Sequence, residues 1–114
     1  MLLRKPDDAT EEIYTVKIWR DTRTGVVIME DWRDARGRPH RIDGPSLIER
    51  DPDSKVLTHE SWNKDGTSHR DDGPSVTKRD SKTGRSTFSA HYINGNHIPK
   101  RDLKKRPLPR CPSP

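Results

Sequence analysis

The chain contains one seven-residue block twice. Residues 40–46 are HRIDGPS and residues 69–75 are HRDDGPS, so the copies differ at a single position and start 29 residues apart. The flanking sequence follows nearly the same spacing, because Trp32 precedes the first block and Trp62 precedes the second. Self-similarity at a fixed period of about 20–50 residues is typical of repeat architectures, in which each copy forms one small structural unit.

A third and weaker copy begins at Val76. It keeps a polar turn and Gly95, replaces the tryptophan with His91-Tyr92, and has Ile98 where the histidine of the block is expected. Terminal repeats often depart from the common pattern because they end the stack. The chain therefore consists of about three copies of one unit.

Each copy predicts a β-hairpin. The candidate strands are rich in β-branched and aromatic residues and are bounded by Gly, Pro, Asp and Ser, and no segment has a convincing apolar helix face. The expected strands are 14–20, 26–32, 46–51, 56–62, 75–80 and 85–93. We predict an all-β fold, an antiparallel meander of about three hairpin repeats with about six strands.

Charge separates the C-terminal tail from the rest of the chain. Residues 99–114 hold six basic side chains against one acidic side chain, which accounts for the whole net charge of +5. The remaining 17 basic and 17 acidic side chains balance, as on a solvated surface rather than in a nucleic-acid groove. We expect a flexible N-terminus over 1–12, the repeat domain over 13–98 and a disordered, basic, Pro-rich tail over 99–114.

Hydrophobic residues make up only 26 % of the chain, so an ordered sheet has little apolar surface to bury. Aromatic side chains bury about 150–250 Å² each, so we expect burial to rest on them. They are Tyr14, Trp19, Trp32, Trp62, Phe88 and Tyr92. An open edge strand predicts that the sheet could form a homodimer.

Cys111 is the one cysteine, which excludes an intramolecular disulfide and a zinc site built from cysteines. The first twelve residues lack the apolar centre of a signal peptide, and no apolar run approaches the ~18 residues of a membrane helix. We expect a cytoplasmic protein that does not bind membranes.

The repeated block admits a chemical and a structural interpretation. A histidine beside an aspartate can perform acid–base chemistry, and His40, Asp43, His69 and Asp72 could together hold a metal. Structurally, the aspartate bonds the downstream backbone, the glycine adopts a conformation closed to other residues, and the proline starts the next strand. The arginine can pair with an acid of the neighbouring repeat, and the histidine can donate to a backbone carbonyl.

We favour the structural interpretation, because a catalytic site is normally unique whereas this motif is copied with the repeat. We therefore expect no catalytic residue, no metal and no cofactor. The predicted structural turn motif comprises His40, Arg41, Asp43, Gly44, Pro45, His69, Arg70, Asp72, Gly73 and Pro74.

Two sets of residues are candidates for partner binding. Trp32 and Trp62 are interpreted either as core residues or as exposed platforms for stacking. The tail offers cations and a proline spacing that resembles a polyproline-II ligand, or serves only as a solubilising extension. The basic candidates are Lys100, Arg101, Lys104, Lys105, Arg106 and Arg110.

The pattern W-x3-G-x2-H-R-x-D-G-P resembles short tandem β-hairpin repeats of phage, large-virus and bacterial proteins, loosely comparable to MORN-type repeats. The match covers roughly residues 26–95, and the longer hairpin turn of this chain lengthens the period. The resemblance implies an all-β repeat fold and no enzyme activity.

Two functions remain as hypotheses. The first is a non-enzymatic protein-interaction module, and the family context suggests a phage or mobile-element inhibitor that docks on a host defence complex. The alternative is a nucleic-acid-binding protein that acts through its basic tail, whose binding would fall steeply between about 50 and 200 mM salt.

Overall fold

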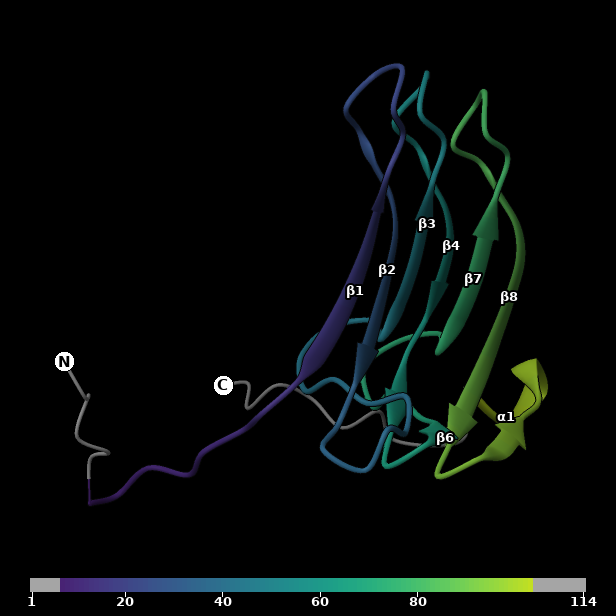
Figure 1. Ribbon diagram of the computed structural model, residues 1–114. Helices are drawn as coiled ribbons and strands as arrows, with labels where there is room; N and C mark the ends of the chain where they lie inside the picture. The colour runs from purple at the N-terminus through teal and green to yellow at the C-terminus, as the bar shows by residue number, and fades with distance from the viewer. Residues whose placement is uncertain (1–6, 104–114) are drawn as a thin grey trace, which may run out of the picture.

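Three long β-hairpins lie side by side in a seven-stranded antiparallel sheet in the computed structural model, which describes residues 7–103 (Figure 1). The strand order is β1-β2-β3-β4-β7-β8-β9, so the chain forms a meander. The all-β hairpin fold predicted from the sequence is confirmed. The strands are β1 (Thr15–Arg20), β2 (Val27–Arg33), β3 (Leu47–Arg50), β4 (Leu57–Ser61), β7 (Val76–Arg79), β8 (Ser86–Ile93) and β9 (Asn96–Ile98).

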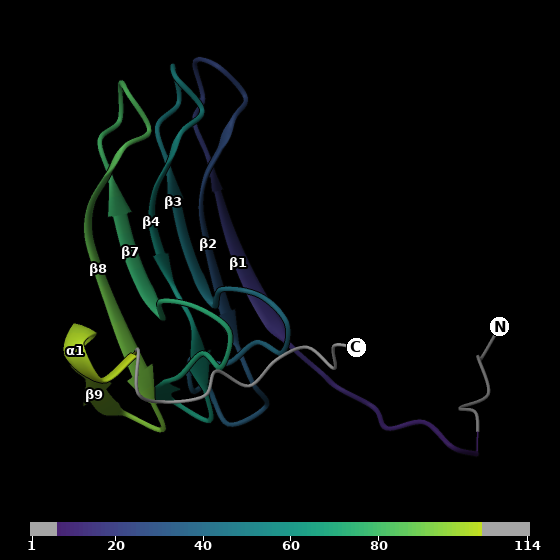
Figure 2. The same ribbon diagram turned by 180° about the vertical axis from the view of Figure 1, so that it is seen from behind.

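The structure also contains short elements that the sequence did not reveal. Strands β5 (Asn63–Lys64) and β6 (Thr67–Ser68) form a separate two-stranded sheet, and β9 pairs with the end of β8. A single helical turn, α1 (Lys100–Leu103), follows β9 in the segment where we expected the disordered tail to begin (Figure 2). The rest of the tail, 104–114, lies outside the described residues.

The three hairpin tips share one turn. Its first residue is an aspartate whose carboxylate accepts hydrogen bonds from backbone N–H groups two or three residues later, at Asp21, Asp51 and Asp80. Its fifth residue has a left-handed backbone, at Gly25 (φ 78°), Lys55 (φ 66°) and Gly84 (φ 76°). Each hairpin therefore reverses with the same chemistry, although Lys55 occupies a conformation that favours glycine.

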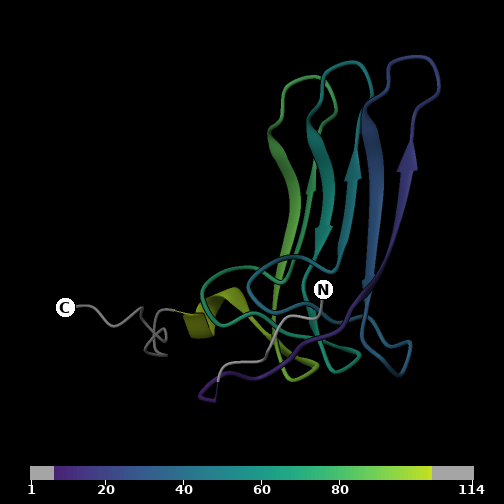
Figure 3. The same cartoon turned by 60° about the vertical axis from the view of Figure 1, so that its left-hand side comes forward.

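A register shift occurs near the tip of each hairpin, between Trp19 and Arg20, between Glu49 and Arg50, and between Lys78 and Arg79. Such bulges bend a strand and increase its local right-handed twist. The three bends lie at matching positions, and the sheet curves along its strands near the tips (Figure 3).

The sheet is a single layer in the described part of the chain, so little of it is buried. Ala90 is the buried apolar side chain there, and the buried polar residues are Ser46, Ser75 and Thr77. Gly44 is buried as well. The prediction that aromatic side chains supply the core is wrong for Trp19 and Phe88, which are 45 % and 51 % exposed. The remaining aromatic side chains are half-buried.

Residues 34–46 and 62–75 connect the hairpins at the end of the sheet opposite the three tips (Figure 1). Both copies of the repeated block lie in these connections, so the fold places them next to each other. No helix within the described residues has the length and hydrophobicity needed to span a membrane.

Candidate functional site

The arginine of each block covers the tryptophan that precedes the block. The Cζ atom of Arg41 lies 3.7 Å from the Trp32 ring centroid, and that of Arg70 lies 3.9 Å from the Trp62 ring centroid. Cation–π contacts of this kind contribute about 0.5–1 kcal/mol at exposed sites and more where water is excluded. Both tryptophans are half-buried, with one face already occupied by an arginine of their own repeat.

The glycine of each block leaves room for that arginine. In the first copy Arg41 Nη1 donates to the Pro45 carbonyl at 3.3 Å, and a Cβ on Gly44 would lie 2.7 Å from Arg41 Nε. The second copy repeats both relationships, at 3.2 Å and 3.1 Å, with Arg70, Pro74 and Gly73. The expectation that this glycine is needed for its backbone conformation is wrong, since the left-handed residue of the first copy is Asp43 (φ 64°).

The aspartate of the second block binds within its own block. Asp72 Oδ1 accepts a hydrogen bond from Arg70 Nε at 2.9 Å. The prediction that Arg70 pairs with an acid of the neighbouring repeat is therefore wrong, because stacking on the tryptophan turns the guanidinium back toward its own loop.

The histidine of each block joins one repeat to the next. Nδ1 of His40 accepts a hydrogen bond from the Asp65 backbone N–H at 2.8 Å, and Nδ1 of His69 accepts one from the Asn94 backbone N–H at 2.9 Å. We expected the histidine to donate to a backbone carbonyl, but it accepts from a backbone amide. Because Nδ1 is the acceptor, the hydrogen of the neutral ring lies on Nε2.

Backbone hydrogen bonds reinforce the same junctions. The Arg41 N–H donates to the Asn63 carbonyl and the Arg70 N–H to the Tyr92 carbonyl, both at 3.2 Å. The Gly66 N–H donates to the Pro39 carbonyl at 2.9 Å, while the Gly95 N–H donates to the carbonyl of Ser68 at 2.8 Å. The block thus connects neighbouring repeats through the same set of contacts at both junctions.

The serine that ends each block is fully buried. Ser46 Oγ donates to the Ser61 carbonyl at 3.3 Å and accepts from Asn63 Nδ2 at 2.7 Å. Ser75 Oγ lies 3.4 Å from the Ala90 carbonyl, to which it donates, and it accepts from the hydroxyl of Ser68. The blocks therefore anchor β3 and β7 by polar contacts where another fold would use an apolar core.

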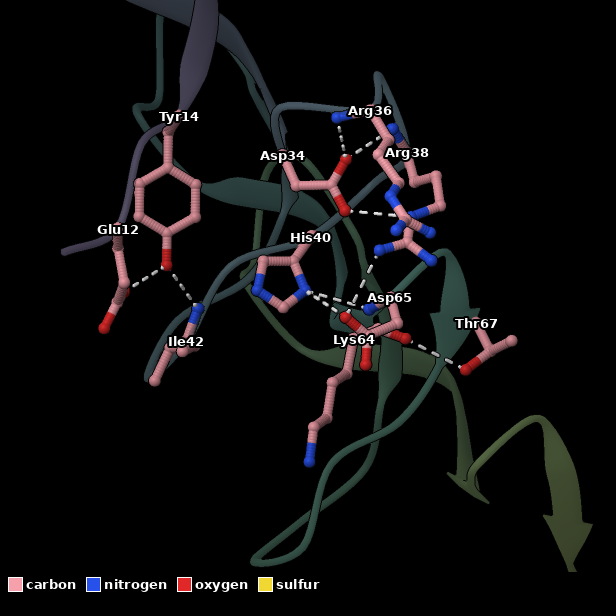
Figure 4. A network of polar contacts seen from close by, with 10 residues as sticks. All are labelled: Glu12, Tyr14, Asp34, Arg36, Arg38, His40, Ile42, Lys64, Asp65 and Thr67. Atoms are coloured by element: carbon pink, nitrogen blue, oxygen red, sulfur yellow. Dashed lines mark hydrogen bonds and ion pairs between the residues drawn. The ribbon is translucent and has the colours of Figure 1, made fainter. Parts of the chain in front are cut away.

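A polar network lies at the first junction (Figure 4). Asp34, His40 and Asp65 bring one ligand atom each within 4.8 Å of one another. The Arg38 guanidinium occupies this cluster, with Nε 2.9 Å from Asp34 and Nη2 3.6 Å from Asp65. Hydrogen bonds from the Arg38 and Arg36 backbone, together with the Arg38 side chain, lower the pKa of Asp34. The guanidinium therefore offsets one of the two carboxylate charges of the cluster.

The metal interpretation of the two blocks does not match this geometry. His40 faces the Asp65 turn, whereas His69 faces Asn94 and places Nε2 3.0 Å from Asp71. Within the described residues, the candidate set His40, Asp43, His69 and Asp72 does not converge on a common point.

Tyr14, just before β1, connects this network to Trp32 of the sheet, a role that the sequence did not reveal. Its ring lies edge-on to Trp32 at 5.3 Å and stacks on His40 at 6.0 Å. Its hydroxyl donates to Glu12 at 2.6 Å and accepts from the Ile42 backbone N–H at 3.1 Å (Figure 4). Burial, and after it the hydrogen bond to Glu12, raise the Tyr14 pKa.

The two tryptophans differ at the indole nitrogen. Trp32 Nε1 donates to Glu30 at 3.0 Å. Glu60 occupies the corresponding position in the second repeat, but it pairs with Arg79. As a result, Trp62 Nε1 is buried without a hydrogen-bond partner within the part of the chain that the structure describes.

A groove of about 580 Å³ separates the two blocks, and Trp62 lies in its wall. Its rim carries charges of both signs and one apolar side chain, Ile42, which is 47 % exposed. The groove combines charged side chains with a tryptophan on which Arg70 stacks. Its lining consists of Arg41, Ile42, Asp43, Trp62, Asn63, Lys64, His69, Arg70, Asp71 and Asp72.

The basic residues proposed for partner binding lie away from this groove or beyond the described part of the chain. Lys100 is exposed on α1, and Arg101 belongs to the same helical turn. The other four, Lys104, Lys105, Arg106 and Arg110, lie outside the described residues. The structure therefore connects the tryptophans to the blocks but does not connect them to the basic tail.

Comparison of the chain with protein-family models, with curated proteins and with solved structures finds no match.

Proposed function

We propose that this chain is a non-enzymatic protein-interaction module whose binding site is the groove between its two repeated blocks. The observation that carries this proposal is the groove itself, with its mixed charges, its exposed Ile42 and the covered Trp62. Interface centres are enriched in aromatic and arginine side chains, whereas their rims are polar.

The histidines support a binding role over a catalytic one. The Nδ1 atoms of His40 and His69 are both used to hold the neighbouring turn. A general base needs a free lone pair directed at its substrate. Because both blocks use this atom in the same way, the repeated histidine serves the architecture of the groove.

The charges of the groove favour a polypeptide over a nucleic acid. The lining balances three acidic side chains against three basic ones: Asp43, Asp71 and Asp72 against Arg41, Lys64 and Arg70. Carboxylates repel a phosphate backbone, while a polypeptide can present both signs of charge and an apolar side chain to Ile42. The partner is therefore proposed to be a protein segment.

An inhibitory role against a host defence complex is the narrower proposal, and it rests on the resemblance of the repeat unit to phage-type repeats. An inhibitor of this kind needs only a docking surface. The two blocks, each hydrogen-bonded to the next repeat, supply such a surface. Cytoplasmic localisation belongs to the same proposal.

The test captures partners from host extract with the wild type and with two variants. Ile42→Asp changes the groove, and Ile13→Asp is the matched control because Ile13 is also exposed and lies outside the groove. We expect Ile42→Asp to lose the captured protein and Ile13→Asp to retain it. Retention by Ile42→Asp would contradict the proposal.

A third arm of this experiment tests the nucleic-acid alternative. Removal of residues 104–114 should leave capture unchanged, and capture should change little between about 50 and 200 mM salt if a protein docks in the groove. Loss of binding on truncation, together with loss on nuclease treatment, would instead support binding of nucleic acid through the tail.

A further inference from the structure

The sheet ends in two strands whose outer edges are unpaired among the described residues. Strand β1 is the first strand of the order, and β8 is paired on its outer side only at its last three residues, 91–93, by β9 (Figures 1 and 2). Residues 86–90 of β8 therefore keep a free outer edge within the described part of the chain. Free edges can pair with another strand.

The internal junctions show how such an edge is paired in this fold. The second strand of one hairpin pairs with the first strand of the next, as β2 pairs with β3 and β4 with β7. Each junction has three register pairs, which begin with Met29 opposite Glu49 in one case and His59 opposite Lys78 in the other. The free edge of β8 belongs to the second strand of a hairpin and the free edge of β1 to the first strand of a hairpin. These two edges could therefore pair as the strands of the internal junctions do.

The hairpin turns place the residues of these free edges in register. Counted back from the first aspartate of its turn, Trp19 occupies the position of Glu49 and Lys78. Counted from the matching register shifts, Phe88 occupies the position of Met29 and His59. An added junction would therefore place Phe88 directly opposite Trp19.

The exposed apolar side chains gather at these two edges. Five large hydrophobic side chains are exposed among the described residues, and three of them lie on β1 and β8: Ile18 (54 %), Trp19 (45 %) and Phe88 (51 %). The corresponding positions of the internal junctions hold the less apolar pairs Met29–Glu49 and His59–Lys78. The edges that face solvent are thus more aromatic than the junctions that are already paired.

We propose that β1 and β8 are a self-association surface and that the partner is a second copy of this chain, bound head to tail. Strand β8 of one copy pairs with β1 of the next, with Phe88 opposite Trp19, Ser89 opposite Ile18 and Ala90 opposite Lys17. The contact continues the repeat-to-repeat interface that the sheet already contains, in the same register.

The hydrogen-bond alternation of the sheet suits this pairing. Trp32 donates to Ser46 across the first junction, so the pairs of that junction alternate and Met29 faces Glu49 without hydrogen bonds between them. By the same alternation Ser89 and Ile18 form the hydrogen-bonded pair. Phe88 and Trp19 form the non-hydrogen-bonded pair, in which opposite side chains lie closer together.

The charges at the hairpin tips predict how self-association depends on salt. At the first junction Arg23 of one hairpin pairs with Asp53 of the next. In the head-to-tail contact Lys82 takes the place of that Arg23, and Arg23 of the next copy takes the place of Asp53. Two cations at the tips repel each other, and salt screens this repulsion. Self-association is therefore expected to strengthen with salt, opposite to binding of nucleic acid.

Head-to-tail contacts use two different surfaces, so they produce open chains or rings rather than a closed symmetric dimer. This inference is independent of the proposed function, because the groove between the blocks lies outside both edges. Loss of one activity can be measured without loss of the other.

The test measures the mass of the full chain by analytical ultracentrifugation for the wild type, Trp19→Glu, Phe88→Glu and their equimolar mixture. Concentrations run up to about 1 mM, the range in which small interfaces dissociate. We expect the wild type to exceed twice its monomer mass of 13.2 kDa and each variant to remain at that mass. The mixture should form a one-to-one dimer, because each variant keeps the edge that the other has lost.

Ile42→Glu serves as the matched control, since Ile42 is also exposed but lies on neither edge, and it should associate as the wild type does. Circular dichroism checks the fold of every variant, and Trp19→Lys with Phe88→Lys replaces any glutamate variant that fails to fold. As a second measurement, Trp19→Cys mixed with Phe88→Cys, both carrying Cys111→Ser, should form a disulfide-linked dimer. A monomeric wild type, or self-association of either charged variant alone, would overturn the proposal.

Discussion

His69 of the second repeat accepts a hydrogen bond on Nδ1 from the backbone N–H of Asn94, at 2.9 Å, in the turn of the third repeat. The first junction has the same contact from His40 to Asp65, again 25 residues along the chain. The repeated histidine is therefore a joint between neighbouring units, and its role depends on the position of the next turn.

Loss of this joint should destabilise the fold. We expect His69→Ala to lower the free energy of unfolding by about 1–2 kcal/mol, because the Asn94 N–H loses its acceptor and the contact from Nε2 to Asp71 is lost as well. Urea denaturation measures the change, with His97→Ala as a control on an exposed histidine. Equal effects of the two substitutions would contradict the role of the joint.

Gly44 should be coupled energetically to Arg41. Gly44→Ala places a Cβ against the guanidinium, so we expect a cost of about 1–3 kcal/mol, as for other overpacked sites. In an Arg41→Ala background this cost should fall by at least half, which a double-mutant cycle would detect. Gly25→Ala, which meets no atom within 4 Å, should cost the same in both backgrounds.

Replacing Lys55 with glycine should stabilise the fold. It has a left-handed backbone at the turn position where the other two hairpins have glycine. Because a left-handed non-glycine residue costs roughly 1–2 kcal/mol, we expect Lys55→Gly to raise the thermal midpoint and the free energy of unfolding by up to about 1 kcal/mol. An unchanged or lower midpoint would show that the turn is not strained.

Acid should weaken the hairpin tips. Backbone hydrogen bonds at the turns lower the pKa of Asp51 and Asp80, and bonds from Thr24, side chain first, lower that of Asp21. The folded state therefore binds fewer protons than the unfolded state at these groups. Their stabilisation is present above the ordinary value of 3.8 and is lost as the pH falls through the lowered values.

The variant Asp21→Asn, Asp51→Asn and Asp80→Asn keeps an acceptor in each turn but removes its charge. We expect its free energy of unfolding to fall less steeply below pH 4 than that of the wild type. Urea titrations at several pH values measure the two slopes, and equal slopes would show that these carboxylates do not control the acid response.

The sequence predicted the hairpins because their period-two strands and Asp-initiated turns are local signals. It also predicted that the repeated block is structural, because both copies carry the same residues. The sequence could not predict which partner each side chain of the block contacts. Whether Arg41 turns toward Trp32 or toward a neighbouring acid depends on a stacking geometry that no local spacing encodes.

The core was the largest error. Aromatic residues at strand positions predict burial when a second layer is present, but within the described residues no second layer covers this sheet. Trp19 and Phe88 consequently remain exposed, and polar anchors such as Ser46 and Ser75 occupy the buried positions. The repeat places Asp65 and Asn94 at equivalent positions, but only the structure shows that the histidines contact these turns.

Amide hydrogen exchange measured by NMR at Asp65 and Asn94 tests the structural role of the blocks most directly. We predict that His40→Ala accelerates exchange at Asp65 while Asn94 keeps its rate, and that His69→Ala has the reverse effect. If neither substitution changes the exchange of the turn that its histidine contacts, the histidines do not join the repeats and the architecture described for the blocks is wrong.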